Sequence, residues 1–131
     1  MEYPTMFRIR QHFDAPTLHD VSGAVREEIA KLDPGQKIKP GQTVAITAGS
    51  RGVANIDTII KTVVEEMKAL DAEPYIVPAM GSHGGGAAEG QTDILAGYGI
   101  TEETMGCPIK SSMEVIQIGT ALIVGSLRWI G

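Results

Sequence analysis

The sequence predicts an α/β fold, a Rossmann-like, open and mainly parallel sheet with flanking helices. Two short apolar runs, at residues 44–48 and 75–80, each end in a glycine-bounded loop. Between them lies a long amphipathic segment whose apolar residues recur at helical spacing from Ile56 to Leu70. Strand, helix and strand together span residues 43–80, a length that suits a right-handed βαβ crossover. If the two strands are parallel neighbours, both loops emerge at the same edge of the sheet.

The N-terminal third of the chain predicts a strand and a helix ahead of this unit. Residues 6–10 alternate weakly and predict a short edge strand. Thr17 is the expected N-cap of a helix whose apolar residues run from Leu18 to Leu32. Residues 33–35, Asp-Pro-Gly, should end that helix. Asn55 is the expected N-cap of the long central helix.

The pattern weakens after the second glycine loop. Residues 91–98 predict a short helix, and Thr101 begins a further helical turn. Residues 114–118 and 121–124 predict two more strands, and the chain then ends on an apolar tail. From that ending we expect residues 1–131 to be a single α/β domain that forms the N-terminal fragment of a larger, two-domain protein.

The composition limits the class of protein. With 131 residues, 43% of them hydrophobic and 21% charged, the chain can bury one core. A net charge of -5 without a basic cluster argues against nucleic acid as a partner. No apolar run is long enough to span a membrane, so we expect no membrane partner. The single cysteine, Cys107, cannot form an internal disulfide and predicts a reducing, cytoplasmic location.

The loop after the first central strand carries an arginine suited to anion binding. Its sequence is Gly49-Ser50-Arg51-Gly52. A guanidinium group matches the geometry of a carboxylate or phosphate, and the helix N-terminus that follows also attracts anions. The alternative is a solvated arginine or one that pairs with a nearby acid. We expect Arg51 and Ser50 to bind an anionic substrate.

The loop after the second central strand carries a histidine among glycines. His83 has the pKa range of a general acid or base, so it is the expected catalytic residue, with Ser82 beside it at the substrate. The alternative is a loop histidine bonded to a carbonyl. His12 and His19 have no such setting and are interpreted as surface residues. Glycines are expected to shape both loops and offer backbone N–H groups: Gly49, Gly52, Gly81, Gly84 and Gly85.

Other kinds of site receive little support. The His-Gly-Gly-Gly sequence at residue 83 occurs in α/β-hydrolases, but no Gly-x-Ser-x-Gly elbow accompanies it. No dinucleotide fingerprint or Walker loop is present, and one cysteine with three scattered histidines predicts no metal site. Cys107 is interpreted as a partly buried small residue, not a nucleophile. Lys110, Ser111 and Ser112 either border the crevice or form a solvated loop.

Two segments resemble the N-terminal domain of the nickel-dependent lactate racemase family. They are residues 48–56, around Arg51, and residues 77–85, around His83. Residues 99–103 and 105–109 resemble a branch of uncharacterised homologues in that family. The resemblance runs from about Met6 to Ile118. It implies a two-domain α/β enzyme that racemises or epimerises a small 2-hydroxy acid by hydride transfer to a nickel-pincer nucleotide.

By position, Arg51 resembles the arginine that holds the substrate carboxylate, and His83 the first of two histidines that act on its hydroxyl. The second histidine, the lysine that attaches the cofactor and the nickel-binding histidine would lie in a missing C-terminal domain. We therefore expect no cofactor on this chain alone, and no activity of the isolated chain. Lactate racemases carry an acidic, Thr-Arg-Pro type loop in place of residues 49–52 and bulkier residues after the histidine, so lactate itself is not implied.

Two hypotheses from other classes stand beside this one. The first is a stand-alone module that binds a small carboxylate or phosphate through the Arg51 loop and the adjacent helix N-terminus. The second is an assembly role, in which the apolar tail at residues 122–130 pairs with another copy as a homo-oligomer.

Overall fold

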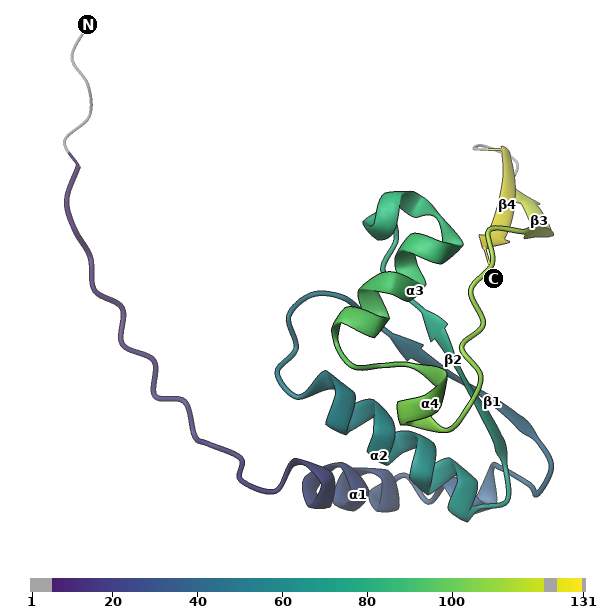
Figure 1. Ribbon diagram of the computed structural model, residues 1–131, viewed down its shortest axis with the longest axis horizontal. Helices are drawn as coiled ribbons and strands as arrows, with labels where there is room; N and C mark the ends of the chain where they lie inside the picture. The colour runs from purple at the N-terminus through teal and green to yellow at the C-terminus, as the bar shows by residue number, and fades with distance from the viewer. Residues whose placement is uncertain (1–5, 122–124, 131) are drawn as a thin grey trace, which may run out of the picture.

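The protein is described by a computed structural model over residues 6–121 and 125–130 (Figure 1). Its elements in chain order are α1 (Val21–Lys31), the 3₁₀ turn η1 (Pro34–Gln36), β1 (Thr43–Ala48), α2 (Ile56–Ala69), β2 (Glu73–Pro78), the 3₁₀ turn η2 (His83–Gly86), α3 (Ala88–Gly97), α4 (Glu102–Met105), β3 (Val115–Ala121) and β4 (Gly125–Ile130).

The central sheet is small and parallel. β1 pairs with β2 from Thr43↔Glu73 to Ala48↔Pro78, so the strand–helix–strand unit has the predicted parallel pairing. On its other edge β2 forms one parallel bridge, at Ile109. The described residues therefore combine helices with a two-stranded parallel sheet, as an α/β fold does. A larger Rossmann-like sheet is not seen among them.

The core lies between this sheet and α2. The even-numbered residues of β1 face α2, and Ile46 and Ala48 are buried there, while Thr43, Ala45 and Thr47 on the opposite face are exposed. This alternation follows from the two-residue period of a strand. The apolar stripe predicted for α2 is the part of that helix that is buried, and its main core residues are Ile56, Ile60, Val64 and Met67.

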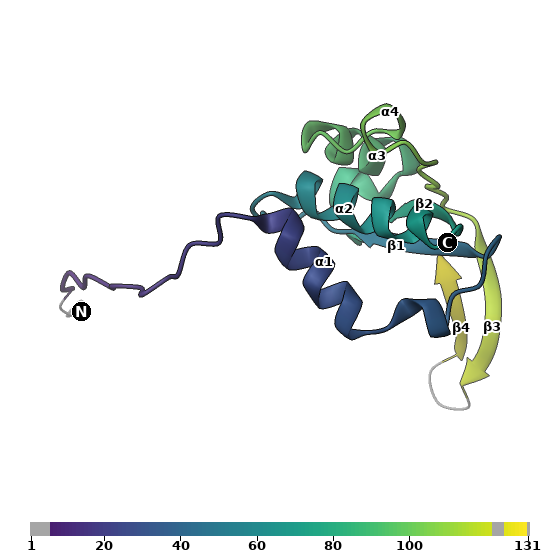
Figure 2. The ribbon, with the colours of Figure 1, turned by 90° about the horizontal axis from the view of Figure 1, so that it is seen from below.

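The N-terminal predictions need correction. Residues 6–18 form neither helix nor strand, so the edge strand expected at residues 6–10 is wrong for this conformation. The segment instead leads away from the rest of the protein (Figures 1 and 2). α1 begins at Val21, not at Leu18, because Asp20 is the N-cap and its Oδ1 accepts a hydrogen bond from Gly23 N at 2.7 Å. An aspartate caps as well as the threonine predicted at residue 17, so the sequence did not distinguish them.

The central helix starts where predicted, but without the predicted side-chain cap. Asn55 is at the N-cap position of α2, yet its side chain makes no capping hydrogen bond. Its backbone has φ of 56°, a left-handed conformation that asparagine tolerates better than most residues. The first N–H groups of α2 therefore have no side-chain partner at the N-cap.

The C-terminal predictions are partly confirmed. α3 and α4 occur where short helices were expected, and Thr101 caps α4 in a capping box. β3 confirms the strand predicted at residues 114–118. Of the strand expected at residues 121–124, Ala121 belongs to β3 and residues 122–124 lie outside the described residues. β4 was not predicted; it pairs with β3 in a separate antiparallel sheet (Figure 1).

Over the described ranges, none of the helices has the length and apolar character needed to cross a membrane. The predicted pairing of the apolar tail with another copy is untested by this structure and stays a prediction.

A core substitution tests this packing. Ile76 on β2 is 0% exposed, whereas Ile116 on β3 is 66% exposed. Ile76→Ala should lower the free energy of unfolding by about 2–5 kcal/mol, because it leaves a cavity in a packed core. Ile116→Ala removes the same atoms from an exposed position and should change it by about 0.5 kcal/mol or less. Urea unfolding measures both, and equal losses would contradict the described core.

Candidate functional site

The two loops predicted to carry chemistry line one crevice. Past the last residues of β1 and β2 the ladder continues, since Ala79 N donates a hydrogen bond to Ala48 O at 2.8 Å. A cavity of about 570 Å³ opens at this edge. It is lined by Gly49, Ser50, Arg51, Val53, Ile56, Ala79, Met80, Gly81, Ser82 and His83. Ligands of open parallel sheets bind at this edge, beyond the carboxyl ends of the strands.

A direct contact joins the two loops. Ser50 Oγ lies 2.5 Å from His83 Nδ1, and both residues are half-buried. Either the hydroxyl donates to Nδ1, which places the neutral ring's proton on Nε2, or Nδ1–H donates to the hydroxyl. In both cases Nδ1 is occupied, and Nε2 is the ring nitrogen that makes no hydrogen bond to the described residues. The structure shows Ser50 as a hydrogen-bond partner of His83 at the wall of the cavity. That Ser50 binds the substrate stays a prediction.

Arg51 supplies the positive charge of the crevice. Its side chain is exposed, and within the described part of the chain it forms no ion pair; the salt bridges there involve Arg26 and Lys31. None of the residues that line this cavity is acidic. The local ion pair considered as an alternative therefore does not form among the described residues. An exposed guanidinium without an ion pair fits both the anion-binding interpretation and the solvated alternative.

The N-terminus of α2 adds to this polarity. Ile56, the first residue of α2, lines the cavity, and the helix has no side-chain cap at Asn55. Uncapped N–H groups and the helix dipole favour negative charge nearby. Asp57 also lies in the first turn, but it lines a different cavity, on the side of Thr58 and Lys61.

Two residues that the sequence did not single out hold the loops in place. Tyr98 Oη donates a hydrogen bond to Ser50 O at 3.1 Å, and Gln91 Nε2 donates one to Gly81 O at 2.8 Å. Both donors lie on or just after α3. Gln91 is 6% exposed and lies on the same helix face as the buried Leu95. The only sequence signal for it was its polar side chain four positions before Leu95.

The loop glycines differ in how far the structure requires them. Gly52, Gly81, Gly84 and Gly85 have φ between 60° and 71°, which side chains rarely adopt. At Gly84 a Cβ atom would also lie 2.3 Å from the carbonyl carbon of Gly90, so the loop packs directly on α3. Gly49 was expected to shape its loop, but a Cβ there would meet only Ala79 O at 3.9 Å, an ordinary contact, so the backbone at this position does not require glycine.

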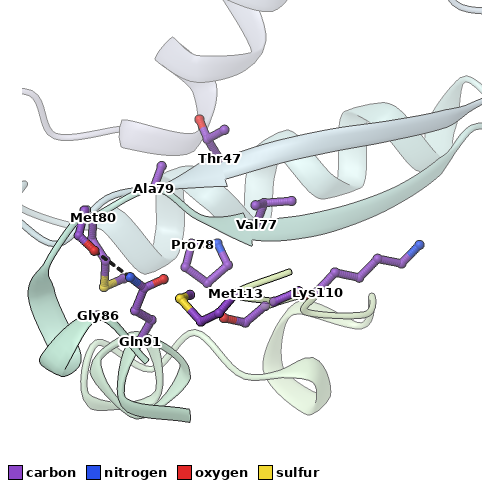
Figure 3. A pocket seen from close by; sticks show the side chains of 12 residues that line it. Thr47, Val77, Pro78, Ala79, Met80, Gly86, Gln91, Lys110 and Met113 are labelled. Atoms are coloured by element: carbon purple, nitrogen blue, oxygen red, sulfur yellow. Dashed lines mark hydrogen bonds between the residues drawn. The ribbon is translucent and has the colours of Figure 1, made fainter. Parts of the chain in front are cut away.

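A second cavity adjoins the crevice (Figure 3). It has a volume of about 390 Å³, shares Ala79, Met80 and Gly81 with the first, and continues past β2 to the segment at residues 110–113. Figure 3 shows the Gln91 amide at its wall, with the hydrogen bond to the loop drawn as a dashed line.

The structure assigns Lys110, Ser111 and Ser112 to this second cavity and not to the crevice. The Lys110 ammonium lies 4.2 Å from the centre of the Tyr75 ring, a cation–π contact that turns its charge away from the cavity. Ser111 Oγ donates to Ala88 O at 3.1 Å, so this hydroxyl ties the segment to the start of α3.

Cys107 and metal ligands have no part in the crevice. Cys107 is buried, and burial raises the pKa of its thiol, against the opposing effect of the Lys68 and Lys61 ammonium groups. A thiol of this kind is a poor nucleophile, in line with the interpretation as a small packed residue. Within residues 6–121 and 125–130, no three histidine, cysteine or acidic side chains gather in a way that could hold a metal ion.

Comparison with known proteins gave no match: no family model, no curated protein and no solved structure is similar to this chain.

Alanine substitutions at Gly84 and Gly85, which have similar backbone angles, test the contact between the His83 loop and α3. Gly84→Ala should destabilise the protein by about 2 kcal/mol or more, because left-handed backbone costs about 1–2 kcal/mol and the new Cβ also collides with Gly90. Gly85→Ala meets no atom within 4 Å and should incur the backbone cost alone. Thermal unfolding compares them, and an equal loss would refute the close packing of the loop on α3.

The burial of Cys107 and the raised pKa of its thiol predict slow alkylation. At pH 8 the folded protein should react with iodoacetamide at least about tenfold more slowly than the chain in urea, since the thiol is both buried and held protonated. Because the folded pKa is raised, the stability linked to this group is fully present below the unfolded pKa and is lost as pH rises through the folded pKa. Mass spectrometry follows the reaction, and equal rates would show that the site is open.

Proposed function

We propose that this chain provides the substrate-binding half of an enzyme that racemises or epimerises a small 2-hydroxy acid, related to the nickel-dependent lactate racemases. The observation that supports it best is the shared crevice, in which a free guanidinium from one loop and a serine-oriented imidazole from the other line the same cavity. These two groups suit the two functional groups of a 2-hydroxy acid, which are a carboxylate and a neighbouring hydroxyl.

Arg51 binds the carboxylate in this proposal. Its planar N–H groups match the two carboxylate oxygens, and the crevice offers no acidic competitor among its lining residues. The N-terminus of α2 stabilises the same negative charge. The carboxylate thereby fixes the orientation of the substrate in the crevice.

His83 acts on the hydroxyl. When Nδ1–H donates to Ser50, Nε2 keeps a free lone pair, and this is the atom that accepts a hydrogen bond from the substrate hydroxyl and takes up or returns its proton. Ser50 is a positioning residue, because it holds the ring without touching the reacting atoms. Tyr98 and Gln91 support the loops behind both residues.

The cofactor that the resemblance implies does not fit the described residues alone. It needs a lysine for its attachment and a histidine for nickel, and the crevice lining contains no lysine and no second histidine. No group of three metal-ligating side chains occurs in the described ranges either. The described residues therefore do not hold that cofactor by themselves.

A stand-alone binding module for a small carboxylate or phosphate is the second candidate. It is favoured by one observation, which is that the crevice contains a cation and a helix N-terminus but only one proton-transfer residue among those that line it. Such a module would bind the anion with an affinity that does not depend on a neighbouring hydroxyl.

Calorimetric titration with lactate, propionate and inorganic phosphate separates the two candidates. If His83 engages the hydroxyl, lactate should bind about 2–10-fold more tightly than propionate, the range expected for one net hydrogen bond. His83→Ala should abolish this preference and leave propionate binding unchanged. Equal binding of lactate and propionate, or a preference for phosphate, would favour the binding module.

The role of Arg51 has a matched control on the same chain. Arg51→Gln should weaken the binding of both carboxylates by about tenfold or more, because it removes a charge-assisted hydrogen bond. Arg8→Gln makes the same change of charge on the exposed N-terminal segment, outside the crevice, and should leave the affinity within about twofold. If both variants lost the same affinity, the cause would be the change in net charge, and a specific contact of Arg51 with the carboxylate would be contradicted.

A further inference from the structure

The helix α1 leaves much of its apolar surface uncovered. None of its residues is fully buried, although it packs along α2. An apolar groove of about 440 Å³ follows the helix and is lined mainly by Leu18, Val21, Val25, Ile29, Leu32 and, from α2, Ile59. Leu18 and Leu32 at its ends are exposed. An amphipathic helix is stabilised mostly by burial of its apolar face, so a covering element is missing from this groove.

One edge of β1 is also unpaired in the described part of the chain. In the described part of the chain β1 has β2 as its only strand neighbour. Gln42 and Ala48 direct their carbonyls to the β2 side, and the alternation of a parallel ladder then turns the backbone groups of Thr43, Ala45 and Thr47 to the open edge. Unpaired strand edges of this kind are templates for another strand.

The N-terminal segment has the pattern of the missing element. In residues 6–13 one set of alternate positions holds Phe7, Ile9 and Phe13, each at least 77% exposed, with the polar Gln11 between Ile9 and Phe13. The other set holds Arg8, Arg10 and His12, preceded by the apolar Met6. A strand with one apolar and one polar face suits the edge of a sheet that has a helix on one side and water on the other.

The connection allows this segment to reach the groove. α1 runs in the same direction as α2 and opposite to β1, and it lies beyond β1, on the far side from α3 and α4 (Figures 1 and 2). This is where a right-handed βαβ crossover places the helix that precedes β1 when its strand lies next to β1. Residues 14–19 would form the strand-to-helix loop, of a length common in such units.

We propose that residues 6–13 dock as a third parallel strand on the open edge of β1 in the same chain, with Phe7, Ile9 and Phe13 in the α1 groove. The segment described as leading away from the protein is then the undocked state of this strand. Docking gives the sheet the order residues 6–13, β1, β2. It also brings residues 14–19 to the same edge as the crevice, because connections to helices leave from the carboxyl ends of parallel strands.

Amide hydrogen exchange on the whole chain, with light scattering at the same concentrations, tests the proposal. We expect a monomer in which the amides of residues 6–13 exchange at least about tenfold more slowly than an unstructured peptide. Ile9→Ser should abolish that protection, because it removes an apolar side chain from the groove. The neighbouring substitution Arg10→Ser lies on the polar face and should leave it within about twofold. Protection of α2 in both variants shows that the rest of the chain is folded.

Two results would overturn the proposal. If residues 6–13 exchange in the wild-type protein as fast as an unstructured peptide, the segment does not dock. If they are protected only in a dimer, and the protection falls on dilution, the groove is filled by the segment of a second copy and docking within one chain is wrong.

Discussion

The parallel pairing of β1 with β2 positions both loops of the crevice. It is in register from Thr43↔Glu73 to Ala48↔Pro78, and it extends one step further through the hydrogen bond from Ala79 N to Ala48 O. Because both strands end together, the loops that follow them leave from the same edge and share one cavity. An antiparallel pair would have sent the two loops to opposite ends, and Arg51 could not have lain near His83.

Contacts with α3 hold both loops of the crevice in place. The chemistry of the crevice depends on its Arg51 and His83 side chains and on the absence of an acidic residue from its lining. Tyr98 and Gln91 each donate a hydrogen bond to a loop carbonyl, while the close approach of Gly84 to Gly90 packs the second loop onto α3. No acid among the lining residues neutralises Arg51, and Ser50 fixes the ring of His83. An anion with an adjacent hydroxyl, the ligand class proposed above, would use both groups.

The sequence predicted β1, α2 and β2 well because the patterns that define these elements are local and strong. The apolar stripe of α2 and the glycine-bounded ends of β1 and β2 need no tertiary information. The rest could not be predicted for identifiable reasons. Thr17 and Asp20 are equally good caps, and only the fold selects Asp20. Tyr98 and Gln91 act through contacts with distant loops, which no periodicity records. The alternation at residues 6–13 is a sound strand pattern, but a strand forms only where an edge accepts it, and in this conformation β1 stands open.

The most direct test of the central claim is a crystal structure of the chain soaked with a 2-hydroxy acid such as lactate. The carboxylate should lie against the Arg51 guanidinium and the hydroxyl within hydrogen-bonding distance of His83 Nε2, with Nδ1 still bonded to Ser50. A ligand bound elsewhere, for example in the cavity beside Lys110, or one held by Arg51 with its hydroxyl turned away from His83, would contradict it.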